Sequence, residues 1–200
     1  MGAWGITIRQ SDYGLDLLGI VVETQLKKVN FSTFNVAEAM DVLRQDILED
    51  IKRTNRGCPP EKLDYYINAN FPRDFAQAAL LIAECLADYY RTGELIVTEY
   101  VGEKYDPVDH HIREFVVTPD DLKVLLDELE SVQNPEHELY QSWFGEDTRQ
   151  KWLAHIQSVR QTLSQYSIST QEKPSIRGKL QRQMELVKAP QKGNSNTQER

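Results

Sequence analysis

Apolar residues recur at three- and four-residue steps along most of the chain, a pattern that predicts a mainly helical protein. Ser11 or Asp12 begins a first helix, in which apolar residues continue to Leu26. Asn35 begins a second helix of about five turns. The apolar face of that second helix consists of Val36, Ala39, Met40, Leu43, Ile47 and Ile51. Gly57 and the following prolines end it.

The middle of the chain predicts two more helices. Residues 61–68 are typical of a short helix, and Pro72 is expected to open a separate one that Gly93 ends. Apolar side chains cover almost the whole circumference of this later helix, so we expect it to be the central, mostly buried element.

The pattern then changes to β-branched and aromatic residues in the segments 95–101 and 112–117. They predict a hairpin over about residues 95–117, with a polar loop of ten residues between the two strands. Thr118 and Pro119 are a helix start, and a last helix is expected over residues 146–165. The predicted fold class is therefore mainly α: a single domain of five to six helices with one β-hairpin.

Composition divides the chain into an acidic body and a basic tail. Residues 169–200 carry seven Lys or Arg against three Glu, whereas the whole chain has a net charge of −8, so residues 1–168 carry −12. The tail is expected to be mobile and mostly disordered, with a short basic amphipathic helix over 175–188. An acidic body repels phosphate backbones, which argues against nucleic acid and favours a basic protein as partner; solubility alone is the simpler explanation. For the tail, partner protein, anionic membrane surface and nucleic acid all stay open, as does contact with its own body.

Cysteine use and hydropathy bear on the compartment. Cys58 lies in a turn-like segment and Cys85 in an apolar helical pattern, a placement that predicts neither a disulfide nor a zinc site. No apolar run reaches the roughly 20 residues that a bilayer requires. We therefore expect a cytoplasmic protein without membrane contact through its body.

The sequence contains no phosphate-binding glycine loop, no nucleophile elbow and no zinc-binding helix motif. The densest polar cluster is Asp106, Asp109, His110 and His111, placed in the predicted hairpin loop. These groups could bind a divalent metal or act as acid and base, although adjacent side chains in an extended loop point apart. We expect no cofactor and no enzymatic activity, with a metal-assisted hydrolase or nuclease at this loop as the alternative.

Charged residues outside that cluster are candidates for contact with a partner. Asp12 and Asp16 share one face of the first helix, where they act either as capping and dipole-compensating groups or as an acidic recognition patch. The second helix adds Glu38 and Asp41 to its outer, solvent-facing side. In the tail, the candidate residues are Arg177, Lys179 and Arg182.

The chain opens with Met1-Gly2-Ala3-Trp4-Gly5, followed by Asp12 and Leu15-Asp16. This opening resembles a family of small bacterial proteins of unknown function that begin Met-Gly-x-Trp-Gly; the resemblance covers the first 30 residues and departs at residues 6–10. It implies a bacterial cytoplasmic protein and supplies no catalytic residue. Residues 173–180 are similar to the ends of accessory proteins on conjugative elements. Trp4 and Gly5 are expected to be structural, with Trp4 inserted into the helical core.

These observations lead to one main hypothesis. The chain is expected to be a non-enzymatic, acidic protein-binding module, of the inhibitor or immunity type, carried on a bacterial mobile element. The hypothesis depends on the acidic body, the missing catalytic motifs and the appended basic segment.

Overall fold

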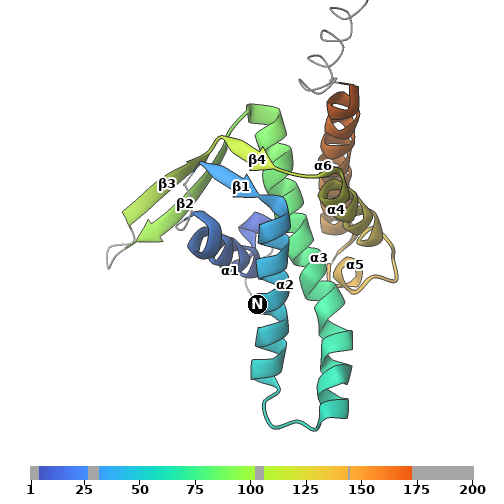
Figure 1. Cartoon of the computed structure of the whole chain (residues 1–200). Helices are drawn as coiled ribbons and strands as arrows, with labels where there is room; N and C mark the ends of the chain where they lie inside the picture. Colours follow the sequence, from blue (N-terminus) through green and yellow to red (C-terminus); the bar gives the residue numbers. More distant parts are fainter. Residues whose placement is uncertain (1–4, 27–31, 102–105, 144, 173–200) are drawn as a thin grey trace, which may run out of the picture. The chain divides into compact units, whose positions relative to one another are not determined.

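A computed structural model describes residues 5–26, 32–101, 106–143 and 145–172 of the 200-residue chain (Figure 1). The chain divides into two compact units, Met1–Ser167 and Ile168–Arg200. Of the second unit, the structure describes residues 168–172, which end a long helix. The predicted basic tail, with its helix at 175–188, otherwise lies outside the described residues.

The first unit is built around three helices, α1 (Asp12–Val21), α2 (Val36–Thr54) and α3 (Pro60–Thr92). Helices α2 and α3 form a long antiparallel pair, with α1 beside α2 (Figure 1). A short 3-10 turn, η1 (Ile8–Gln10), precedes α1, and a π-helical turn, η2 (Val22–Leu26), follows it. The predicted starts are confirmed: Ser11 Oγ accepts a hydrogen bond from the Gly14 N–H, and Asn35 Oδ1 accepts one from the Glu38 N–H.

Burial in α2 follows the predicted periodicity. All six residues of the expected apolar face are buried, and Val36, Ala39 and Leu43 have no exposed surface. Asn55 caps the helix, and Gly57 then adopts a φ of 86°, a left-handed conformation that favours glycine. The sequence therefore determined both the face and the end of this helix.

Helix α3 corrects the prediction of two separate helices. It runs without interruption from Pro60 to Thr92, with Pro72 inside it. An internal proline costs about 3 kcal/mol because it removes a backbone hydrogen bond. Packing around Pro72 acts against that cost: the rings of Phe71 and Phe75 stack with centroids 5.4 Å apart, and the Arg44 guanidinium of α2 lies 4.8 Å from the Phe75 ring centroid. The segment 75–87 is buried throughout, as predicted for the central helix.

The β-structure confirms a hairpin but corrects its strands. Strand β2 (Leu95–Val101) pairs antiparallel with β3 (Asp106–Ile112), in a register that sets Leu95 opposite Ile112. The predicted second strand, 112–117, is instead split at Arg113. Its later part is strand β4 (Glu114–Val116), which pairs in parallel with β1 (Thr33–Asn35). Neighbouring residues reveal nothing of that parallel pairing, because its partners are some 80 positions apart in the chain.

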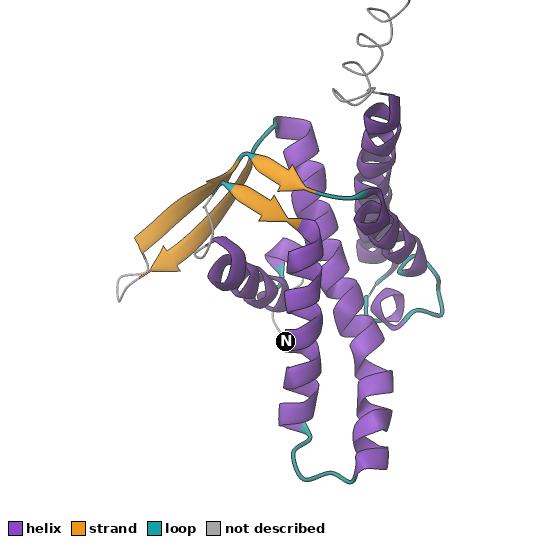
Figure 2. Cartoon of the chain, in the orientation of Figure 1, coloured by secondary structure: helices purple, strands orange, loops and turns teal. Residues whose placement is uncertain are grey.

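Three further helices complete the described fold (Figure 2): α4 (Pro119–Ser131), α5 (Glu138–Gln141) and α6 (Glu146–Glu172). Thr118 caps α4 as predicted, and its hydroxyl accepts a hydrogen bond from the Asp121 N–H. Helix α6 begins where expected but extends beyond residue 165. Its Trp152 stacks on Trp143, with ring centroids 5.3 Å apart. The described chain is thus mainly helical with one β-hairpin, as predicted.

Hydropathy of the helices gives one further result. Among the described helices, none has a stretch long and apolar enough to cross a membrane.

Candidate functional site

Helix α1 presents an acidic, partly apolar outer face. Asp12 and Asp16 are exposed on it, and between them the Leu15 side chain is 54% exposed. Ser11 provides the cap, so Asp12 contributes only the favourable charge of a first-turn carboxylate. Neither carboxylate forms an ion pair with any residue that the structure describes. Both are therefore available to a positively charged partner.

Helix α2, which packs beside α1, carries exposed acidic residues of its own near its start. Glu38 and Asp41 are exposed and likewise form no ion pair within the described part of the chain. Further along the helix, burial and the neighbouring Asp50 raise the pKa of the Asp46 carboxyl. Burial, Asp74 and Asp50 together raise the pKa of the Tyr13 phenol far above its usual range. In both cases burial is the largest cause of the raised pKa, and the neighbouring carboxylates add to it.

Helix α4 carries a second acidic surface that the sequence analysis did not single out. Burial and Asp127 raise the pKa of the Glu128 carboxyl. The base on this helix, Lys123, is already paired with Asp127 at 3.0 Å. The acidic residues of α4 are Asp120, Asp121, Asp127, Glu128 and Glu130. Five acidic residues within the thirteen residues of this helix are the sequence signal that could have identified this surface.

A different arrangement of charge lies inside the molecule, where η1, α3 and α6 meet. Glu84 of α3 is only 3% exposed, and its Oε1 accepts a hydrogen bond from the Ile8 N–H at 3.0 Å. The same oxygen lies 2.8 Å from His155 Nε2 of α6. One carboxylate thus joins the N-terminal turn, the central helix and the last helix. We call Glu84, His155, Arg9 and Asp88 the buried junction, after Glu84 at its centre; the other three side chains are half-buried.

Arginines complete the buried junction at its outer edge. The Arg9 guanidinium donates a hydrogen bond to Asp88, and its Nε lies 3.9 Å from Glu84 Oε2. On the next turn of α3, Arg91 pairs with Asp88 at 3.4 Å and donates a hydrogen bond to the Ser158 hydroxyl of α6 at 3.1 Å. These contacts hold elements together rather than surrounding a substrate. Sequence reasoning placed His155 at the edge of the apolar face of the last helix and missed Glu84, whose signal was the one acid within the apolar segment 75–87.

The four candidate metal or acid–base residues lie on strand β3, so their predicted placement in a loop is wrong. Because side chains alternate along a strand, His110 is buried against the body while Asp109 and His111 are exposed. Asp109 accepts a hydrogen bond from the Thr98 hydroxyl at 2.7 Å, and His111 Nδ1 lies 3.1 Å from Glu94 Oε1. Asp106, at the other end of the strand, is exposed.

Glu94 contacts both His111 on the outer face of the hairpin and Arg113, the residue that follows strand β3. Its carboxylate also accepts a hydrogen bond from Arg113 Nε at 3.0 Å. The hydrogen bonds from Arg113 and His111 lower the pKa of Glu94. Such an arrangement stabilises a turn of chain, and on the described residues no group of three or more His, Cys, Asp or Glu side chains comes together as a metal site.

The two cysteines occupy contrasting environments and are both free. Cys85 is 1% exposed beside the buried junction, and burial raises the pKa of its thiol to about 12. Cys58 is half-buried in the turn between α2 and α3.

The remaining candidates divide between described and undescribed residues. Trp4, Arg177, Lys179 and Arg182 lie outside the described residues. Gly5 is described, and a Cβ added there would come within 2.3 Å of the Gln10 Cβ. This close approach fits the structural role expected of Gly5.

Comparison with known proteins finds no matching family model, no matching curated protein and no matching solved structure. The resemblance of the first 30 residues to the Met-Gly-x-Trp-Gly proteins therefore stays a prediction.

Proposed function

We propose that this chain is a non-enzymatic binding module whose acidic α1–α2 surface, formed by Asp12, Asp16, Glu38 and Asp41, engages a basic protein. The observation that carries the proposal is the absence of counterions: within the described residues, none of these four carboxylates has an ion-pair partner. Three other exposed acids, Asp50, Asp127 and Glu146, are each paired with a base on their own helix. A further four exposed acids have, like those of the proposed surface, no ion pair among the described residues: Glu61, Asp64, Glu136 and Asp147.

Unpaired surface carboxylates that act together raise the rate of association with a positively charged partner. The exposed Leu15 adds apolar area beside the α1 carboxylates. A partner that offers Lys or Arg around an apolar side chain would satisfy both features. In the narrower form of the proposal, the partner is a cytoplasmic bacterial enzyme, such as a nuclease, which this chain inhibits.

The test compares two variants with the same change of charge. The first replaces the four interface carboxylates: Asp12→Asn, Asp16→Asn, Glu38→Gln and Asp41→Asn. The matched control neutralises four exposed acids elsewhere: Glu61→Gln, Asp64→Asn, Glu136→Gln and Asp147→Asn. Each set includes first-turn acids of two helices, so the loss of helix-dipole stabilisation is similar.

A partner captured by the wild-type chain is identified, purified and titrated calorimetrically against all three proteins. We expect the interface variant to lose at least about tenfold in affinity while the control keeps wild-type affinity. Equal losses of affinity in both variants would mean that binding depends on net charge alone. No loss in either variant would mean that this surface does not bind the partner.

The metal-assisted alternative has its own test. Strand alternation sends His110 and His111 to opposite faces of the hairpin, so the described geometry adds no support to a shared metal site. Metal content and hydrolase activity of a His110→Ala, His111→Ala variant would be compared with those of the wild type. A loss of either would revive this alternative.

A further inference from the structure

The outer half of the β2–β3 hairpin receives little support from the rest of the fold. Leu95 and Ile112, which pair where the hairpin leaves the body, are both buried. Toward the other end, where the two strands extend past α1 (Figure 2), residues 106–109 are all exposed. Because side chains alternate between the faces of a strand, this run of exposed residues means that both faces of β3 meet solvent there. A two-stranded ribbon in water is only marginally stable, and a further strand would stabilise it.

The two edges of the hairpin differ in their capacity to pair with another strand. On β3, Pro107 has no N–H to donate, and Asp106 and Asp109 add exposed charge. Proline and charged residues are the features by which edge strands resist association. Strand β2 reads Leu-Ile-Val-Thr-Glu-Tyr-Val, with one charged residue, no proline and otherwise aliphatic, β-branched or aromatic residues. Its outer edge is therefore the better site for a further strand.

Every second residue of β2 directs its N–H and C=O groups away from β3. A proline inside a sheet is confined to a position whose N–H would face away from the neighbouring strand, so the outward set in β3 includes Pro107. Its partner Tyr100, and with it Ile96 and Thr98, form the outward set in β2. The Thr98 hydroxyl lies 2.7 Å from Asp109 Oδ1, which agrees with the closer spacing of side chains in a pair that does not exchange backbone hydrogen bonds.

The outward backbone groups of Ile96 and Thr98 have no strand to pair with. Within the described residues, β3 is the only neighbour of β2 in the sheet, and no backbone hydrogen bond reaches Ile96 or Thr98 from a loop or turn. The Ile96 side chain is 50% exposed, so apolar surface accompanies the unpaired backbone. The edge therefore offers the two features that strand addition uses, backbone hydrogen bonds and contacts of alternate side chains.

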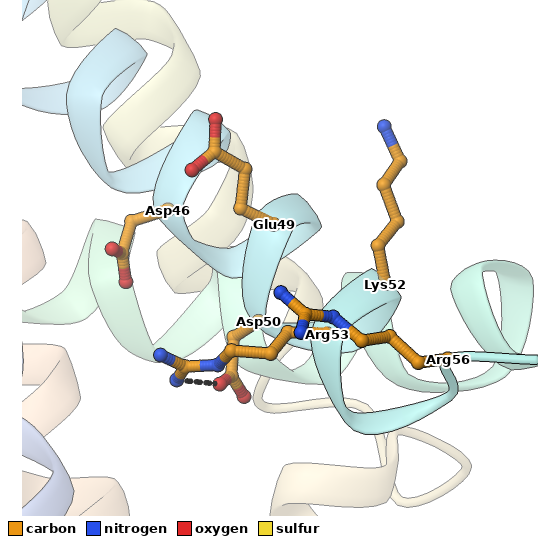
Figure 3. A pocket seen from close by; sticks show the side chains of 6 residues that line it. All are labelled: Asp46, Glu49, Asp50, Lys52, Arg53 and Arg56. Carbon is orange, nitrogen blue, oxygen red and sulfur yellow. Dashed lines mark hydrogen bonds and ion pairs between the residues drawn. The ribbon is translucent and has the colours of Figure 1, made fainter.

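The exposed surface at the end of α2 has the opposite character. Charged, exposed side chains of the helix and of the turn after it line a hollow of about 440 Å³ there (Figure 3). They are Asp46, Glu49, Asp50, Lys52, Arg53 and Arg56. Charged residues are depleted from the cores of protein interfaces, because burial removes their hydration. Association is therefore expected at the edge of β2 and not at this hollow.

We propose that the outer edge of β2 pairs antiparallel with β2 of a second copy of this chain, which joins the two hairpins into one four-stranded sheet. The two-fold axis of such a pair stands perpendicular to the sheet between the two strands, and rotation about it leaves each face of the sheet on the same side. Paired residue numbers then run in opposite directions from the axis. With the axis at Thr98, all seven residues of β2 are paired: Thr98 with the partner's Thr98, Ile96 with the partner's Tyr100 and Leu95 with the partner's Val101.

The β2 sequence is complementary to itself in this register, which favours a second copy as the occupant. The register sets strand-forming residues opposite one another, and it pairs the outward residues Ile96, Thr98 and Tyr100 only among themselves, as backbone hydrogen bonds between the copies require. The one charged residue, Glu99, falls opposite the partner's Val97 and meets no like charge across the pair. The inference is independent of the proposed binding function, because it uses no residue of the acidic α1–α2 surface.

The experiment measures dimerisation of the full chain by sedimentation equilibrium, from micromolar to near-millimolar protein. About 0.3 M salt screens the repulsion between two chains that each carry a net charge of −8. Thr98→Pro removes the outward N–H at the axis, which two-fold symmetry uses twice, and leaves the hydrogen bonds between β2 and β3 in place. The matched control Asp109→Pro makes the same change at the residue paired with Thr98, on the outer edge of β3. We expect Thr98→Pro to weaken dimerisation at least about tenfold and Asp109→Pro to leave it within about twofold of the wild type.

A second pair of variants tests the edge without proline. Ile96→Lys and Val108→Lys each place a lysine at an exposed apolar position of the hairpin, on β2 and β3 respectively. Lysine on an edge strand opposes pairing, so only Ile96→Lys should weaken dimerisation, by at least about fivefold. This pair decides the question if circular dichroism shows that either proline variant is unfolded. A wild-type chain that stays monomeric throughout would overturn the proposal, as would equal weakening by the variants of both strands or a dimer that none of them changes.

Discussion

The buried junction and the exposed face of α1 use the same kinds of residue for different purposes. In the junction, Glu84 is 3% exposed and contacts Ile8 and His155, so its charge is fixed by its neighbours. On the exposed face, Asp12 and Asp16 have solvent around them and no described counterion. A carboxylate of the first kind determines how the chain is assembled, whereas the second kind is free to act on another molecule.

The largest difference should appear when the carboxylate of the junction is removed. Glu84→Ala leaves the Ile8 N–H and His155 without their acceptor and removes a negative charge beside Arg9. We expect unfolding free energy to fall by about 3–5 kcal/mol, as for other broken buried pairs. Urea denaturation followed by circular dichroism measures it. Glu84→Gln, which retains an acceptor, should lose less; equal losses would mean that the negative charge, and not the acceptor alone, accounts for the stabilisation.

Two glycines of α1 sharpen the same contrast within one helix. A Cβ at Gly14 would lie 1.9 Å from the Ile8 carbonyl oxygen, whereas a Cβ at Gly19 meets nothing within 4 Å. Gly14→Ala should therefore destabilise the protein by about 3 kcal/mol, because the backbone of the N-terminal turn must move. Gly19→Ala should stabilise it by about 0.5–1 kcal/mol through helix propensity. Thermal unfolding of both variants gives the comparison, and similar values would contradict the packing of η1 on α1.

The cysteines extend the contrast to chemical reactivity. Burial raises the pKa of the Cys85 thiol to about 12, whereas Cys58 is half-buried in a turn. Since the thiolate is the reactive form, a thiol reagent at pH 8 should modify Cys58 at least about a hundredfold faster than Cys85. Mass spectrometry of each peptide over time would measure the rates. In urea the two rates should converge; fast labelling of Cys85 in the folded protein would show that the junction opens readily.

The smallest effect is expected on the exposed face. Asp12→Asn and Asp16→Asn remove charges that form no ion pair with the described residues. We expect each to change the unfolding free energy by no more than about 0.5 kcal/mol, as is usual for surface substitutions. Denaturation under the conditions used for Glu84→Ala checks this. A loss of 2 kcal/mol or more would mean that these carboxylates have a structural role.

Local signals predicted those parts of the fold that depend on neighbouring residues. Asn35 and Thr118 cap helices at the expected positions, and the buried face of α2 matches its periodicity residue by residue. These features follow from hydrogen bonds within four residues and from the helical repeat. Pro72 shows where such reasoning fails, because packing against α2 is able to outweigh the cost of an internal proline.

For the candidate sites, too, some features followed from the sequence and others depended on contacts between distant residues. The sequence by itself determined that the body is acidic and helical, since charge and periodicity are properties of composition and order. Only the tertiary structure decided that Glu84 joins η1, α3 and α6, because its partners are separated from it by 76 and 71 positions. It also placed His110 and His111 on opposite faces of a strand, through a register with β2 that no local pattern specifies. Contacts between distant residues depend on how elements pack, and packing is the sum of many weak interactions across the whole first unit.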